Sequence, residues 1–347
     1  MNKILPILVV GILVLSGLGA VALPSDKILV DSYIKENEQN NVPLDDELDQ
    51  SQTNYDEKCP GPVGYIPFNT SWNVSIAQSF TPTKEILTRV VLYAGKNATT
   101  SYPYVLAIRD NRTGENLALA SVNPDEFMVF PNISWIEFDF DDIIISIGET
   151  YYMVSYTSNV TDNFYVWGAN CSDIYPNGTA HVSLDGGETW QTAPDADLCF
   201  MTYGREPTPD LDCDGELSWT DVKPGDTVTG SFTVENIGDP GSLLDWKIES
   251  YPDWGDWTFT PSSGDDLTPE DGQVTINVSV IAPDEKNKQF TGNVTVCNQD
   301  DPTDCCTIPV SLTTPKNKPF NFNFNLLSWL FERFPNAFPI LRYVLEL

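Results

Sequence analysis

Histidine and the familiar nucleophile motifs are almost missing from this sequence. His181 is the single histidine, and no Gly-x-Ser-x-Gly motif occurs. One imidazole cannot build a multi-histidine zinc site, and without the motif a serine hydrolase is disfavoured. We therefore expect no catalytic residue and a protein that is not an enzyme. The alternative is a secreted carbohydrate-active hydrolase that uses a carboxylate pair, because acidic residues occur throughout the chain.

Positive charge is also scarce. The chain has 18 Lys and Arg residues against 50 Asp and Glu residues, a formal net charge of -32. This charge repels the phosphates of nucleic acids and of anionic lipids, so we expect no nucleic-acid partner. No calcium loop of the Asp-x-Asp-x-Asp-Gly kind occurs, and we expect the acidity to provide solubility. We predict no metal site and no cofactor, with Ca²⁺ bound by clustered carboxylates as the alternative.

A long apolar run occurs only at the start of the chain. Lys3 precedes the apolar run Ile4–Leu15, and Ala20-Val21-Ala22 follows, an arrangement that predicts a cleaved signal peptide over residues 1–22. Residues 23–44 are polar and acidic and are expected to form a linker. No later stretch reaches the roughly 18 apolar residues that a membrane-spanning helix requires. We therefore expect a secreted protein, located outside the cell or at its surface.

Helical periodicity is absent from the middle of the chain, where short runs rich in Val, Ile, Tyr, Phe and Trp alternate with turns. Many short strands between turns favour β-sandwiches. We expect an all-β protein with a jelly-roll β-sandwich over residues 45–206. Pro207 and Pro209 mark a hinge, and an immunoglobulin-like β-sandwich of about seven strands is expected over residues 207–314.

The cysteines of an exported chain should mostly form disulfides. In the second domain, residues of one parity along a strand face the same way. By this rule Cys213 and Cys306 point into the core, whereas Cys297 and Cys305 point outward across a hairpin. We predict bridges between Cys213 and Cys306 and between Cys297 and Cys305. The sequence leaves open the pairing of the other three, Cys59, Cys171 and Cys199.

Asn-x-Ser/Thr sequons are more frequent than the composition predicts, and all ten lie within the two proposed domains. In an exported chain each sequon is a candidate for N-glycosylation. The alternative is a Ser/Thr/Asn-rich β protein that carries no glycan. The candidate asparagines are Asn69, Asn73, Asn97, Asn111, Asn132, Asn159, Asn170, Asn177, Asn277 and Asn293.

The most specific local motif runs from Ser183 to Trp190 and matches Ser-x-Asp-x-Gly-x-Thr-Trp. This motif resembles the Asp-box, a hairpin turn of sialidases and other secreted β proteins. Asp185 is expected to accept hydrogen bonds from its own turn, Gly187 to supply positive φ, and Trp190 to pack under the hairpin. A sialidase is disfavoured, because those proteins carry several copies and an arginine cluster.

Other motifs extend the resemblance over both domains. Ala77–Thr81, Trp135–Phe140 and Tyr175–Ala180, with the Asp-box, resemble a jelly-roll module of large secreted archaeal and bacterial proteins. That resemblance implies adhesion or glycan binding. Asn236–Gly238 and Pro261–Gly264, with alternating valines, resemble Ig-like modules of the BACON type, which implies a spacer. We expect Trp246, Trp254 and Trp257 to serve core or edge packing rather than sugar stacking.

The C-terminal tail, residues 315–347, is rich in Phe and Leu and is interrupted by Pro335 and Pro339. Three roles remain open: an interfacial membrane anchor, a sorting or assembly signal, and a strap on the second domain. Its resemblance to C-terminal segments of exported archaeal proteins favours sorting or anchoring to a membrane or envelope. The expected protein thus binds a glycan or another cell-surface ligand, and a purely structural envelope component is a further alternative.

Overall fold

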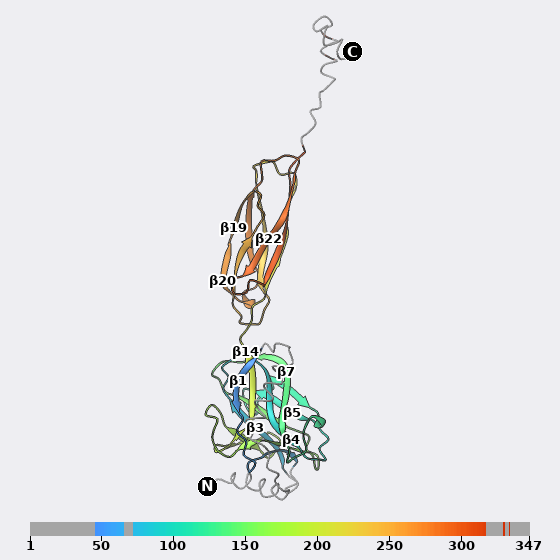
Figure 1. The fold of residues 1–347 in the computed structure, drawn as a ribbon, viewed down its shortest axis with the longest axis vertical. Coiled ribbons are helices and arrows are strands. Elements are labelled where there is room, and N and C mark those ends of the chain that lie inside the picture. Colours follow the sequence, from blue (N-terminus) through green and yellow to red (C-terminus); the bar gives the residue numbers. More distant parts are fainter. Residues whose placement is uncertain (1–45, 66–71, 317–328, 330–332, 334–347) are drawn as a thin grey trace. The chain divides into compact units, whose positions relative to one another are not determined.

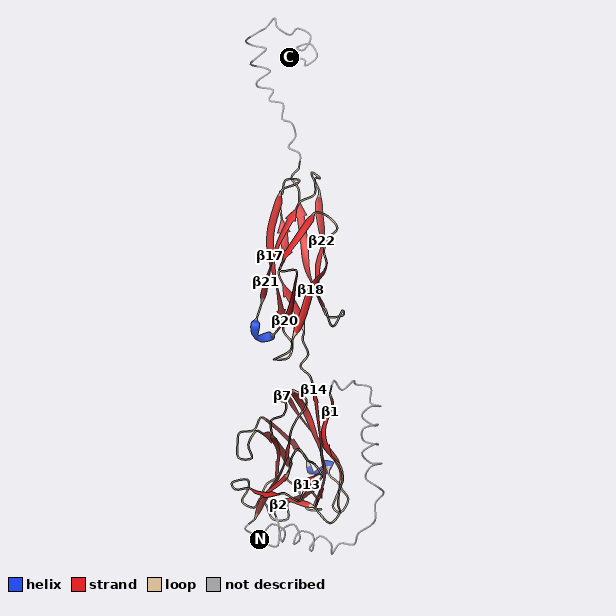
Figure 2. Ribbon diagram, turned by 90° about the vertical axis from the view of Figure 1, so that its left-hand side faces the viewer, coloured by secondary structure: helices blue, strands red, loops and turns tan. Residues whose placement is uncertain are grey.

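The computed structural model describes residues 46–65 and 72–316, together with Trp329 and Arg333. The predicted signal peptide, linker, Asn69 sequon and nearly all of the C-terminal tail lie outside these residues. The chain divides into two compact units between Pro207 and Thr208, and each is described by itself (Figure 1). Between residues 46 and 316 the described chain forms strands, turns and two 3-10 helices, η1 (Pro124–Glu126) and η2 (Pro269–Asp271), shown in blue in Figure 2.

The first unit contains two antiparallel sheets that share strand β3. The first sheet follows the path β1-β14-β4-β9-β2-β3, with β7 on the other side of β4, and the second follows β6-β5-β8-β3-β11-β12. A short pair, β10-β13, stands apart. The strands are β1 (Glu47–Gln52), β2 (Gly61–Tyr65), β3 (Asn73–Phe80), β4 (Ile86–Lys96), β5 (Tyr104–Arg109), β6 (Ala118–Val122), β7 (Ser134–Ile144), β8 (Tyr151–Tyr156), β9 (Phe164–Trp167), β10 (Ala169–Asn170), β11 (Ala180–Ser183), β12 (Gln191–Ala193), β13 (Asp197–Leu198) and β14 (Phe200–Arg205).

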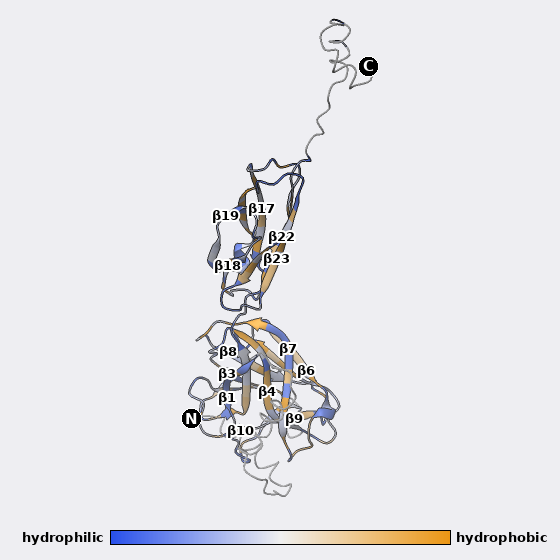
Figure 3. Cartoon of the chain, turned by 45° about the horizontal axis from the view of Figure 1, so that its top comes forward, coloured by the Kyte–Doolittle hydropathy of each residue, from blue (hydrophilic) through white to orange (hydrophobic). Residues whose placement is uncertain are grey.

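The core of this unit lies between the two sheets because every second side chain of a strand faces inward. Leu92 of β4 and Phe138 of β7 meet Leu106 of β5 and Met153 of β8 in one buried cluster. Figure 3 shows the alternation as hydrophobic and hydrophilic bands along β7. The intervening residues of each strand therefore point away from this core.

The second unit is a sandwich of a four-stranded and a five-stranded sheet, ordered β15-β17-β21-β19 and β16-β23-β22-β18-β20. All neighbours are antiparallel except β16 and β23, which run parallel. The core holds Trp246, which is 1% exposed, together with the alternating valines Val234, Val278, Val280, Val294, Val296 and Val310. The strands are β15 (Leu211–Asp214), β16 (Leu217–Trp219), β17 (Thr227–Asn236), β18 (Leu244–Ser250), β19 (Asp256–Thr260), β20 (Ser263–Leu267), β21 (Val274–Ile281), β22 (Gln289–Asn298) and β23 (Cys305–Thr313).

Trp254 and Trp257 pack against this core. Both are half-buried against it, and their rings lie 5.2 Å apart. Each indole N–H donates to a backbone oxygen, at 3.1 Å from Trp254 to Thr291 and 2.7 Å from Trp257 to Trp254. The packing role expected for the three tryptophans is therefore confirmed.

Three disulfides cross-link the described chain. The second unit contains Cys213–Cys306, which joins β15 to β23 across the sandwich, and Cys297–Cys305, which joins adjacent residues of β22 and β23. These are the pairs that the parity argument selects. Cys297 is nonetheless buried, so only Cys305 has the exposed position expected for both. The first unit contains Cys59–Cys171, while Cys199 is buried outside the bridges, with Sγ 3.5 Å from the Gln52 amide nitrogen.

The prediction of an all-β chain built from β-sandwiches is confirmed by these sheets. Three disulfides are typical of proteins that fold in an oxidising compartment outside the cytosol. In the part of the chain that the structure describes, no helix has the length and apolarity needed to cross a bilayer.

Candidate functional site

The outward side of the sheet β6-β5-β8-β3-β11-β12 carries a surface of aromatic, small and basic side chains. We call this surface the β8 face. Its strands send no acidic side chain outward, although the chain contains 50 acidic residues. The outward positions are Leu119, Ser121, Val105, Ala107, Arg109, Tyr152, Val154, Tyr156, Ser75, Ala77, Ser79, His181, Ser183 and Thr192.

Small buried side chains lie beneath the rings of the β8 face. Ala77, Val154 and Ala107 are directly paired across β3, β8 and β5, and each is at most 2% exposed. They form a small apolar cluster separate from the main core, with partly exposed aromatic rings packed around it. Tyr152 and Tyr156 belong to β8, on either side of Val154, and alternate outward because strand side chains have a period of two. The three small side chains are therefore covered, and the partly exposed rings form the apolar part of the β8 face.

Trp190 is the third aromatic ring of the β8 face and is held by the turn between β11 and β12. The Asp185 carboxylate accepts hydrogen bonds from the Ser183 hydroxyl at 2.7 Å and from the Thr189 backbone N–H at 2.9 Å. These bonds stabilise the ionised form and lower the Asp185 pKa to about 2. Gly187 has φ 99°, as expected, and its carbonyl accepts the Trp190 indole N–H at 3.0 Å. The Asp-box motif therefore acts here as a support for an aromatic ring.

His181 and Arg112 form the polar corner of the β8 face. His181 lies on β11, is 6% exposed, and has its Nδ1 2.9 Å from Nη1 of Arg112. Because an arginine can only donate, this nitrogen must accept, and the imidazole is neutral with its proton on Nε2. Burial, with the Arg112 charge as second cause, lowers the His181 pKa to about 4. The Arg112 guanidinium also lies over the Tyr152 ring, 5.7 Å from its centroid.

We expect His181 to stay neutral down to about pH 4. Its pKa is lower folded than unfolded, so the unfolded chain binds the proton more readily, and stability is lost as pH falls from 6.5 through about 4. The loss should be on the order of 3 kcal/mol. Because the chain has one histidine, its ring resonances in an NMR titration report this group alone. His181→Gln keeps an acceptor for Arg112 and should remove this part of the pH dependence, and an imidazole titrating near pH 6.5 would contradict the prediction.

The nine sequons within the described residues are distributed over both units and do not cluster at one site. Asn111, Asn132, Asn159, Asn177, Asn277 and Asn293 are exposed, whereas Asn73, Asn97 and Asn170 are half-buried. The Asn97 amide donates both to the Thr99 hydroxyl and to the Asp162 carbonyl, and the Asn170 amide donates to the Asn54 carbonyl. A glycan on Asn97 would replace one of these donors. Glycosylation at all ten positions stays a prediction.

A second group of charges lies on the outward side of the other sheet, in a hollow next to β4, β7 and β14. Its carboxylates are Asp46, Glu137, Asp139 and Asp142, and two arginines lie among them. Arg89 bonds Asp46 at 2.9 Å and Glu137 at 3.0 Å, and Arg205 bonds Asp142 at 2.9 Å. These ion pairs hold three of the carboxylates, so the hollow is better explained as structural than as a carboxylate pair for hydrolysis.

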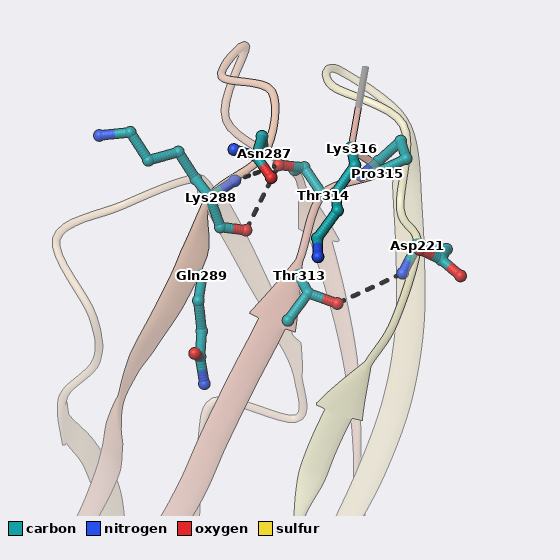
Figure 4. A pocket seen from close by; sticks show the side chains of 8 residues that line it. All are labelled: Asp221, Asn287, Lys288, Gln289, Thr313, Thr314, Pro315 and Lys316. Carbon is teal, nitrogen blue, oxygen red and sulfur yellow. Dashed lines mark hydrogen bonds between the residues drawn. The ribbon is translucent and has the colours of Figure 1, made fainter. Parts of the chain in front are cut away.

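A further hollow lies at the end of the second unit, where β23 leads toward the tail (Figure 4). Its polar groups bond one another: Thr314 exchanges two hydrogen bonds with the Lys288 backbone, and the Thr313 hydroxyl accepts from the Asp221 N–H. No aromatic ring lines it. Within the described ranges, no three His, Cys, Asp or Glu side chains converge as they would around a metal ion.

Most of the β8 face was missed by the sequence analysis. Arg109, Arg112 and Tyr156 were not selected, because an outward tyrosine and an inward one look alike until strand pairing is known. One feature of the sequence could have indicated the two arginines, because two arginines within four residues are unusual in a chain with so few basic groups. His181 and the Asp-box were noted, and the structure brings them to the same edge of the sheet.

No protein-family model and no curated protein matches this chain. Among solved structures, the ASH/PapD-like domain 7 of human CEP192 is 14% identical with a TM-score of 0.23, over 31% of this chain and 87% of that one. The Vibrio cholerae VesB protease is 11% identical, with a TM-score of 0.21 over 66% and 96%. Domains 4 and 5 of the S-layer protein SbsC are 15% identical, with a TM-score of 0.22 over 51% and 90%. TM-scores this low support no conclusion about function.

Proposed function

We propose that this is a non-catalytic extracellular or cell-surface protein that binds carbohydrate through the β8 face. The observation that carries the proposal is the group of three partly exposed rings, Tyr152, Tyr156 and Trp190, packed over the buried side chains of Ala77, Ala107 and Val154. Aromatic faces beside a few fixed polar groups are the usual lining of a binding site, and sugars present C–H faces that pack on such rings. His181 and Arg112 supply the fixed polar groups.

The rest of the molecule fits a supporting role. The first unit is assigned as a jelly-roll glycan-binding module and the second as a BACON-like spacer, with residues 315–347 as the sorting or anchoring segment. The proposed function requires no cofactor and no catalytic residue. Disulfides in both units support export to an oxidising exterior.

Tyr152→Ala is expected to weaken glycan binding by about tenfold or more, which corresponds to roughly 1.4 kcal/mol. The substitution removes one of the three rings of the β8 face. It also removes the ring over which the Arg112 guanidinium lies, so that guanidinium loses part of its support. Binding would be measured on a glycan array with the purified full chain, followed by titration of each hit.

Tyr251→Ala is the matched control, because Tyr251 is 53% exposed and belongs to the second unit. It should leave binding unchanged. Equal losses in both variants would place the site elsewhere, and the absence of binding to every glycan would favour the structural envelope component.

A further inference from the structure

The arginines of the described chain fall into two groups. Between residues 46 and 316, Arg89 and Arg205 form ion pairs with carboxylates. Arg109 and Arg112 bond only neutral groups there, and no carboxylate oxygen lies within 4.0 Å of either guanidinium. In a protein with 50 acidic and 18 basic residues, a counter-ion would be easy to supply. Arg109 and Arg112 lack a carboxylate counter-ion in the described chain, and the strands of the β8 face send no acidic side chain outward. This arrangement points to an anion from outside the chain.

Existing contacts hold both guanidinium groups in place. Arg109 donates from Nε to the Asn116 side-chain oxygen at 2.8 Å and from Nη1 to the Arg112 carbonyl at 2.9 Å. Arg112 donates to His181 and lies over the Tyr152 ring. Within the described residues, Nη2 of each guanidinium makes no hydrogen bond. Each group therefore keeps N–H donors for a ligand while its orientation is already set.

The neighbouring groups make a neutral ligand a poor match. Arg109 donates to the backbone carbonyl of Arg112, so both residues belong to one corner of the β8 face. Their hydrogen-bond acceptors there, the neutral His181 ring included, carry no charge that would offset a guanidinium. A bound carboxylate or sulfate would supply that counter-charge and accept paired N–H donors from a planar guanidinium.

We propose that Arg109 and Arg112 bind the acidic group, carboxylate or sulfate, of a glycan that packs on the β8 face. This inference rests on the proposed carbohydrate-binding function and names the chemical class of the ligand. The rings bind the sugar and the arginines bind its charge. Because the net charge of the protein repels polyanions, such binding requires a local site of this kind.

The test compares each acidic polysaccharide with a neutral form that has the same sugar backbone. Full-length protein is titrated by isothermal calorimetry against polygalacturonate and its methyl-esterified form, and against dextran sulfate and dextran. We expect at least tenfold tighter binding to one or both charged polymers, and the two arms separate a carboxylate ligand from a sulfate ligand. Arg112→Gln and Arg109→Gln should each abolish the preference. Arg112→Lys keeps the positive charge but lacks the paired N–H donors of the planar guanidinium, so this variant should retain part of the preference for the charged polymer.

Lys223→Gln is the matched control, because it removes one exposed positive charge from the second unit. It should leave the preference intact, and melting temperatures of all variants confirm folding. Equal binding of charged and neutral polymers, lost in Tyr152→Ala, overturns this inference and leaves the proposed function standing. An equal loss of the preference in Lys223→Gln also overturns the inference, and no binding to any polymer rejects both.

Discussion

Replacing Cys213 and Cys306 together by alanine is expected to lower the free energy of unfolding of the second unit by about 4 to 5 kcal/mol. The bridge closes a separation of 93 residues and joins the first strand of the sandwich to the last. Its removal lets the unfolded chain explore far more conformations, which is the main source of the loss in the chain-entropy model. Thermal and urea unfolding of the oxidised full chain would measure it.

The Cys297–Cys305 bridge provides the control, because it spans a separation of 8 residues between paired strands. The same model assigns about 2 to 3 kcal/mol to so short a loop. Replacing both cysteines by alanine should therefore destabilise the unit clearly less. A larger loss in this variant than in the first would contradict the explanation by loop length.

Arg89→Ala is expected to destabilise the first unit by about 3 to 5 kcal/mol, because it leaves the Asp46 carboxylate buried without its partner. The side chains of Arg89 and Asp46 are 5% and 6% exposed, and two of their hydrogen bonds are 2.9 and 3.2 Å long. The Arg89 guanidinium also packs 3.6 Å from the centroid of the Tyr203 ring. Urea unfolding followed by tryptophan fluorescence would measure the loss.

Arg205→Ala is the matched surface comparison. Its partner Asp142 is 44% exposed, so the carboxylate can return to water when the arginine is removed. This partly exposed pair should contribute no more than about 1 kcal/mol. Similar losses in the two variants would show that burial does not determine the effect.

The second unit was the easier of the two to predict, for a physical reason. Its core strands alternate clearly, as in Val274–Ile281, so parity distinguishes most buried residues from exposed ones. The same parity selected both bridges of the unit. The first unit offers no such rule for Cys59 and Cys171, because neither residue lies in a strand. Their pairing depends on where loops meet, which only the folded chain shows.

Buried polar groups were the other feature beyond reach of the sequence. Asp197 is fully buried, and its oxygens accept from the Gln78 amide at 3.1 Å and from the Ile174 and Tyr175 N–H groups at 2.8 and 2.9 Å. In a list of 50 acidic residues nothing distinguishes this one. Its partners come from two segments far from it in the sequence, so its role depends on the tertiary fold.

The same limit applies to the candidate site. The Asp-box was recognised because its turn chemistry is local and its spacing is fixed. Tyr152, Tyr156 and Arg112 meet on one surface only because β8 pairs with β5 and β3 in a particular register. A shift of one residue would send both tyrosines into the core.

The Cys213–Cys306 bridge also determines how the second unit bears a pulling force. A load that enters at Thr208 and leaves after Thr314 reaches β15 at one end and β23 at the other. Because these strands are covalently joined, tension passes through the bridge and bypasses the strands between them. About 300 Å of extended chain stays locked inside the loop of 93 residues. Under a pulling force the oxidised unit should therefore extend only slightly. Reduction of the Cys213–Cys306 bridge would allow the strands between these cysteines to unfold and extend.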